Sequence, residues 1–120
     1  CVLVCVHSFT PVYLGVSRPV HIGVLFDKSA RLAHGLLAEL GRDPSFNVGA
    51  NVPYGVSPDE DYALLVYGDN LGNPAVLIEM RHDLVAKPED CRRWGAQLAT
   101  VLANVVEAQA KSQPPVRNSV

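Results

Sequence analysis

Residues 20–26 read VHIGVLF and residues 29–41 read SARLAHGLLAELG, and this succession decides the class of fold. The first stretch is short, mostly apolar and bounded by loop residues, which predicts a buried strand. In the second stretch the leucines recur with the one-sided spacing of a helix that covers a core. Asp27 or Ser29 can cap the start of this helix through a side-chain oxygen, and Gly41 is placed to end it.

Further apolar stretches extend the pattern on both sides. Residues 1–6 (CVLVCV) predict a fully buried strand, and residues 7–19 read as a long loop interrupted by two prolines and a glycine. Residues 46–56 predict a short strand that runs into a loop rich in Gly, Pro and Asn. YALLVYG at residues 62–68 and PAVLIEM at residues 74–80 flank the turn sequence GDNLGN and predict a hairpin.

The last predicted element is a helix that begins near Pro88, a residue that the first turn of a helix tolerates. A helical stripe follows, formed by Trp94, Leu98, Val101 and Val105. Lys111 and the prolines at 114–115 end it. Strands that are buried on both faces and alternate with helices predict a three-layer α/β domain over residues 1–111, with a disordered tail over residues 112–120.

Composition excludes several classes of function. Ten basic and twelve acidic residues give a formal charge of −2 without any basic run, so nucleic-acid binding has no support. No apolar stretch approaches the ~20 residues of a membrane-spanning helix. Cys1 and Cys5 lie about 13 Å apart on an extended segment, too far for a disulfide. With Cys91 as an odd third, we expect buried free thiols in a reducing compartment, and hence a cytoplasmic protein.

Common sequence motifs are absent. There is no GxGxxG, phosphate-binding loop, HExxH, GxSxG or CxxC in the chain. The sequence also begins with Cys inside an apolar run and without a secretory signal, so we expect a fragment whose upstream part is missing. What remains as a source of chemistry is a set of polar residues at the ends of apolar strands.

His7 directly follows the apolar run at residues 1–6, where the crevice of an open α/β sheet lies. It is either a zinc ligand or a histidine that is simply hydrogen-bonded at a strand end. Glu79 interrupts the apolar strand VLIEM, where burial raises the pKa of a carboxyl group and suits it to general-base work. The alternative for Glu79 is a structural ion pair with Arg81 on the same face; Arg81 can also hold an anionic substrate as a rigid fork.

The other polar candidates carry weaker signals. His34 lies away from the leucines of its helix and is expected to be solvated, whereas His21 is expected to be partly buried with its hydrogen bonds satisfied. His82 follows the strand that contains Glu79 and lies either at the surface or in the same crevice. Asn51, Tyr54 and Tyr62 lie in or beside a loop that either binds a ligand or serves ordinary turn chemistry.

Four strings occur in order along the chain: HSFTPVYLGVSRPVHIGVLFD, RLAHGLLAEL, VGANVPYGVSPDEDYAL and VLIEMRHDL. Together they resemble the N-formylglutamate amidohydrolase family over roughly residues 3–105. The resemblance implies a three-layer α/β/α sandwich with a mixed sheet, similar to the zinc-dependent exopeptidases. It also implies a hydrolase that removes an N-formyl or related acyl group from an amino acid, at the end of histidine breakdown in the best-known case.

The same resemblance implies roles for individual residues. His7 matches a zinc ligand, Glu79 matches the general base, and Arg81 matches the arginine that follows it. Asn51, Pro53 and Tyr54 match an NxPY-type loop that is expected near the substrate.

The chain also departs from the family pattern. Val20 stands where Trp is usual and His82 where Asn is common. The family's other zinc ligands, a histidine and an acidic residue, belong to an N-terminal half that this sequence lacks. A catalytic zinc needs about three protein ligands, so we expect the fragment itself to be inactive. A non-catalytic binding or assembly module is the alternative, and an exposed sheet edge is expected to favour aggregation or pairing with a second copy.

Overall fold

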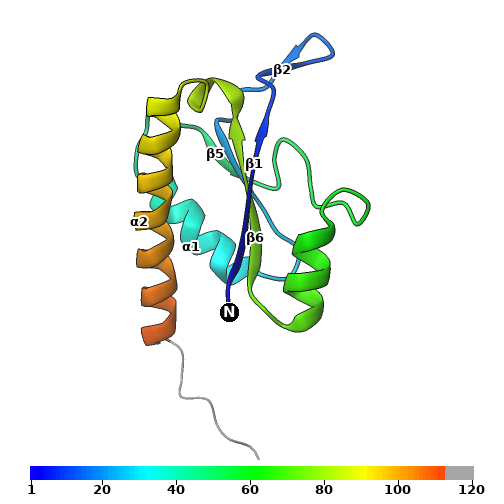
Figure 1. The fold of residues 1–120 in the computed structure, drawn as a ribbon, viewed down its shortest axis with the longest axis vertical. Helices are drawn as coiled ribbons and strands as arrows, with labels where there is room; N and C mark the ends of the chain where they lie inside the picture. Colours follow the sequence, from blue (N-terminus) through cyan, green and yellow to red (C-terminus); the bar gives the residue numbers. More distant parts are fainter. Residues whose placement is uncertain (113–120) are drawn as a thin grey trace, which may run out of the picture.

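The computed structural model describes residues 1–112, which form a four-stranded mixed sheet with helices. The sheet order is β1-β6-β4-β5, and its strands are β1 (Leu3–Phe9), β6 (Ala75–Arg81), β4 (Ile22–Leu25) and β5 (Val48–Ala50). β1 runs parallel to β6, β6 antiparallel to β4, and β4 parallel to β5. Figure 1 shows β1 and β6 side by side in the middle of the molecule. The predicted mixed α/β sheet is confirmed.

Helices cover both faces of the sheet. Helices α1 (Ala30–Leu40) and α2 (Pro88–Ser112) lie on one face, and the short segments η1 (Leu64–Gly68) and η2 (Asp69–Leu71) lie on the other (Figure 1). The alternation of side chains along β6 explains both layers, because successive residues of a strand point to opposite faces. Val76, Ile78 and Met80 join the core with the two long helices, whereas Ala75 and Leu77 pack with Leu64.

The two long helices follow the sequence prediction closely. Ser29 is the N-cap of α1 and Gly41 its C-cap, although the Ser29 hydroxyl accepts the Ala75 amide at 2.8 Å instead of capping its own helix. Helix α2 begins at Pro88, and its apolar stripe is buried as predicted: Trp94, Leu98, Val101 and Val105. The prolines at 114–115 and nearly all of the predicted tail at 112–120 lie outside the described residues.

The hairpin predicted at residues 62–80 is wrong. Residues 64–68 form a helical turn instead of a strand, so β6 pairs with β1 and β4. In this turn Leu64 and Gly68 are buried against the sheet, whereas Tyr62 and Tyr67 are more than half exposed. A Cβ atom at Gly68 would collide with Ala75, which shows how closely the turn packs on β6. A seven-residue apolar run fits a strand and a short helix equally well, and packing decided between them.

The prediction of a fully buried first strand is also wrong. β1 lies at an edge of the sheet and extends to Phe9, so His7 lies within the strand rather than after it. Val6 is 55% exposed, and no strand among the described residues pairs with the outer edge of β1. The predicted loop at residues 7–19 contains a small hairpin, β2 (Val12–Tyr13) paired with β3 (Val16–Ser17).

Other expectations about surface residues can be compared directly. All three cysteines are free, but Cys1 and Cys91 are exposed and Cys5 is partly buried, so the expectation of buried thiols is wrong. His34 is exposed, as predicted. The His21 ring accepts the Asn47 amide at 2.8 Å through Nδ1, which confirms its satisfied state. No helix in residues 1–112 has the length and apolar character needed to cross a bilayer.

Gly23 of β4 lets a neighbouring loop cross closely over the sheet. A Cβ atom at this position would collide with the carbonyl oxygen of Val52. We therefore expect Gly23→Ala to displace this loop and to lower the free energy of unfolding by about 1–3 kcal/mol, the usual cost of overpacking. Urea denaturation measures the loss.

Gly55→Ala is the matched control, because a Cβ atom at Gly55 has no neighbour within 4 Å. We expect the free energy of unfolding of this variant to stay within about 0.5 kcal/mol of the wild-type value. Equal values for the Gly23 and Gly55 variants would contradict the close approach described above.

Candidate active site

His7 and Glu79 meet on neighbouring strands. They are paired in register between β1 and β6, and Nδ1 of His7 lies 3.7 Å from Oε1 of Glu79. Both residues lie near the carboxyl ends of parallel strands, the edge at which α/β sheets bind ligands. Two residues that stand 72 positions apart in the chain thus become neighbours at this edge of the sheet.

Glu79 is buried on the face of the sheet opposite the long helices. Only 2% of the residue is exposed, and the Tyr54 hydroxyl donates a hydrogen bond to Oε1 at 3.1 Å. Oε2 is buried and has no hydrogen-bond partner among the described residues. One carboxylate oxygen is thus held in place, and the other has no hydrogen bond to any of the described residues.

The surroundings of Glu79 favour its protonated form. Burial raises its pKa, and the nearby Asp61 carboxylate adds to this effect, whereas the Tyr54 hydrogen bond and the charges of His7 and Arg18 oppose it. Burial and the Glu79 charge raise the pKa of Tyr54 to about 12. Tyr54 therefore stays a hydrogen-bond donor, and Glu79 binds a proton more readily than an exposed carboxylate does.

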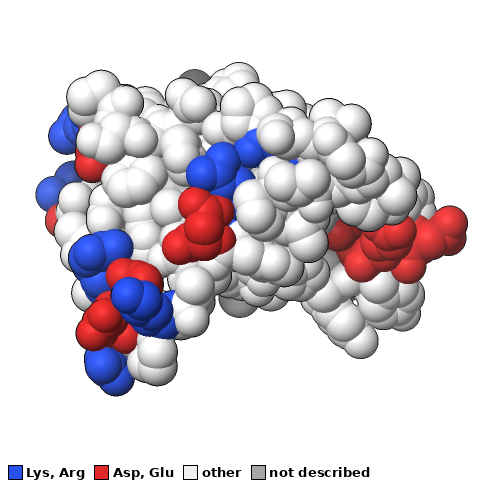
Figure 2. Space-filling view, turned by 90° about the horizontal axis from the view of Figure 1, so that it is seen from above, with Lys and Arg blue, Asp and Glu red and all other residues white. Residues whose placement is uncertain are grey.

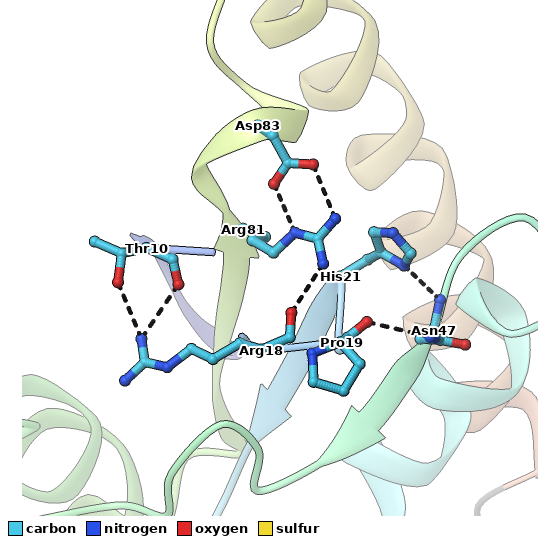
Figure 3. A network of polar contacts seen from close by, with 7 residues as sticks. All are labelled: Thr10, Arg18, Pro19, His21, Asn47, Arg81 and Asp83. Carbon is cyan, nitrogen blue, oxygen red and sulfur yellow. Dashed lines mark hydrogen bonds and ion pairs between the residues drawn. The ribbon is translucent and has the colours of Figure 1, made fainter. Parts of the chain in front are cut away.

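Arg81 does not form the predicted ion pair with Glu79. Its Nε and Nη2 donate to the two carboxylate oxygens of Asp83, at 2.6 and 3.0 Å, and its Nη1 donates to the Arg18 carbonyl at 2.9 Å (Figure 3). Asp83 lies two residues further along the chain and supplies a bidentate partner, a geometry that arginine favours. This hydrogen bonding raises the pKa of Arg81 and lowers that of Asp83. The substrate contact suggested for Arg81 stays a prediction.

Asn51 and Tyr54 belong to the loop after β5. Asn51 has a positive φ of 53°. Its side-chain Oδ1 accepts a hydrogen bond from the Phe26 backbone amide at 2.9 Å, and its backbone amide donates to the Val24 carbonyl at 3.0 Å. This is turn chemistry, one of the two alternatives for Asn51. The anchored turn allows the loop to place the Tyr54 hydroxyl on Glu79. A substrate contact of Asn51 stays a prediction.

A cavity of about 470 Å³ opens beside Tyr54. Its lining residues come from the end of β1, the small hairpin, the Tyr54 loop and the segment after β6: Ser8, Phe9, Thr10, Tyr13, Arg18, Tyr54, Glu60 and His82. His82 is exposed, one of its two predicted positions, and lines this cavity, whose walls include neither His7 nor Glu79. In Figure 2, which views this end of the molecule from above, most of the surface is uncharged. A small N-acyl amino acid fits a cavity of this size.

Two residues of this region have no clear signal in the sequence. Arg18 lies in a segment predicted as loop, and Asp61 stands before an apolar run that was predicted as a strand. Asp61 is 8% exposed and its carboxylate accepts the Ser57 amide at 2.7 Å, an arrangement that ties down the start of the helical segment. The aspartate–apolar pattern of a helix start was the one sequence signal that could have revealed Asp61.

A complete metal site is not found in the part of the chain that the structure describes. Residues 1–112 contain no group of three or more His, Cys, Asp or Glu side chains that could hold a metal ion. The His7 ring is about half exposed and offers one imidazole. A catalytic zinc needs about three protein ligands, so these residues do not by themselves fit zinc.

Comparison with known proteins gives a consistent result. The model of the N-formylglutamate amidohydrolase family matches residues 1–86, and no curated protein matches the chain. The crystal structure of gene product Atu2144 from Agrobacterium tumefaciens is similar, with a TM-score of 0.77 and 34% identity. The match covers 91% of this chain but 44% of that protein. The chain thus belongs to the N-formylglutamate amidohydrolase family.

Proposed function

We propose that the intact protein hydrolyses the N-acyl bond of a small N-acyl amino acid such as N-formylglutamate, with Glu79 as general base. The observation that supports this proposal most is the buried Glu79 carboxylate beside His7, with one oxygen held by Tyr54 and the other unpartnered among the described residues. Family membership and the neighbouring cavity add support.

In the proposed reaction the two carboxylate oxygens of Glu79 have different roles, because only Oε1 is hydrogen-bonded to Tyr54. Oε2 accepts a proton from a water molecule, whose oxygen forms a bond to the acyl carbon. The carbon–nitrogen bond then breaks, and Glu79 returns the proton to the leaving nitrogen, so that a carboxylic acid and a free amine are formed. Tyr54 holds Oε1 throughout and keeps the carboxylate oriented. The raised pKa of Glu79 helps it to accept the proton.

Zinc enters this proposal as an expectation from the family. His7 is proposed as one ligand, and the others would come from outside residues 1–112, because these residues hold no group of three. Bound zinc would supply a Lewis acid to such a site. On this proposal residues 1–120 alone are inactive, and the intact protein acts in the cytoplasm and serves histidine breakdown.

Glu79→Gln in the intact protein tests the general base. We expect turnover of N-formylglutamate to fall by about 10²–10⁴-fold, because glutamine keeps the shape of the side chain but cannot accept the proton. Steady-state kinetics and a thermal melt of the variant measure the loss and the integrity of the fold.

Glu89→Gln is the matched control, since Glu89 is an exposed carboxylate of α2 that does not line the cavity. We expect its turnover to remain close to that of the wild type. A Glu79→Gln protein that is folded and fully active would remove Glu79 from the proposed role.

Metal analysis separates the enzyme from a non-catalytic binding module. We expect the intact protein to contain about one equivalent of zinc, and His7→Ala to lower this content. Val6→Ala is a suitable control, because Val6 precedes His7 on the same exposed edge and has no ligand atom. Absence of zinc from an intact protein that lacks turnover would favour the binding module.

A further inference from the structure

The small β2–β3 hairpin places Arg18 above the cavity. The Arg18 amide donates to the Pro11 carbonyl at 2.8 Å and closes the hairpin, and the Arg18 carbonyl accepts from Arg81 at 2.9 Å. Figure 3 shows that the backbone carbonyl of Arg18 accepts a hydrogen bond from Arg81 and that its guanidinium donates to Thr10. The backbone of Arg18 is therefore fixed from the hairpin and from β6.

The guanidinium of Arg18 lies among aromatic rings. Its Cζ atom is 4.8 Å from the ring centre of Tyr13, 5.7 Å from that of Phe9 and 5.8 Å from that of Tyr54. Cation–π contacts of this kind orient a guanidinium while leaving its N–H groups free to bind other atoms. The aromatic surroundings hold the Arg18 side chain at the wall of the cavity.

Arg18 has no acidic partner in residues 1–112. The ion pairs of this region join His7 to Glu79 and Arg81 to Asp83. The side-chain hydrogen bonds of Arg18 are two long contacts from Nη1 to Thr10, at 3.4 and 3.5 Å. Glu60 lines the same cavity but forms no ion pair with Arg18. A fixed guanidinium with an unneutralised charge at a cavity wall is suited to bind an anion.

Tyr54 connects this cation to the proposed general base. Its ring lies against the Arg18 guanidinium, and its hydroxyl donates to Glu79. The charge of Arg18 opposes part of the rise in the pKa values of Tyr54 and Glu79, which places it within electrostatic reach of both groups. Tyr54 therefore links the wall of the cavity at Arg18 to the proposed general base Glu79.

We propose that Arg18 binds a carboxylate of the N-acyl amino acid and thereby determines substrate specificity. This inference rests on the proposed function, because it assigns the anionic part of that substrate to Arg18. The guanidinium donates two parallel hydrogen bonds to one carboxylate, and the cavity beside it accommodates the remainder of the molecule. Arg81 acts as a positioning residue, since it is paired with Asp83 and holds the Arg18 carbonyl.

Kinetics of Arg18→Gln in the intact protein test this assignment. The substrates are N-formylglutamate and its two monoamides, N-formylglutamine and N-formylisoglutamine, each of which lacks one carboxylate. We expect kcat/KM for N-formylglutamate to fall by about 10- to 150-fold, the range for hydrogen bonds to a charged group. The monoamide that lacks the carboxylate bound by Arg18 should lose far less. Arg18→Lys should lose an intermediate amount, because lysine keeps the charge but not the fork.

Arg93→Gln is the matched control, because Arg93 is an exposed arginine of α2, on the opposite side of the sheet. Its kinetics should equal those of the wild type. Equal losses on all three substrates in Arg18→Gln would overturn the proposal, since they would indicate a structural role only. Unchanged kinetics for N-formylglutamate would overturn it as well.

A binding measurement separates this proposal from the proposed function. Calorimetry of N-formylglutamate with Glu79→Gln, and with the double variant that adds Arg18→Gln, requires no turnover. Weaker binding in the double variant supports the Arg18 site even if the wild type hydrolyses nothing, a result in which only the proposed function fails. Equal binding in the two variants overturns the Arg18 site even if hydrolysis is observed.

Discussion

The parallel pairing of β1 with β6 is the constraint on which the rest of the site depends. It sets His7 opposite Glu79 and directs both toward the face that the long helices leave open. Because side chains alternate along a strand, a slip of one residue would turn Glu79 into the core formed with α1 and α2. The apolar residues on both sides of Glu79 in β6, Ile78 and Met80, fix the register through their burial in that core.

Burial of Glu79 opposes folding. A carboxylate with 2% exposure and one oxygen without a partner among the described residues disfavours folding in its charged form. The Tyr54 hydrogen bond and the nearby positive charge of Arg18 offset part of this cost. Apolar packing on both faces of β6 supplies the stability that such an arrangement requires. Local violations of this kind are typical of functional sites.

Local patterns predicted much of the fold, and non-local packing explains what they missed. The leucine spacing of α1 and the stripe of α2 are periodic over several turns, so the sequence specifies both helices. The seven apolar residues at 62–68 have no such length, and only contact with β6 decides their helical form. The edge position of β1 depends on strand order, which no local pattern encodes. His7 and Glu79 were predicted because each stands out against an apolar strand.

The two arginines of the site show why residue spacing alone misleads about charge. Arg81 shares a face of β6 with Glu79, yet it pairs with Asp83, whose geometry accepts two hydrogen bonds. Its charge is thereby neutralised within the fold, and its remaining bond fixes the backbone of Arg18. Arg18, which no motif singled out, keeps an unpaired charge among the described residues. The distribution of ion pairs, rather than proximity along the strand, is therefore the reason for proposing Arg18 as the arginine that binds an anion, whereas a substrate contact of Arg81 stays a prediction.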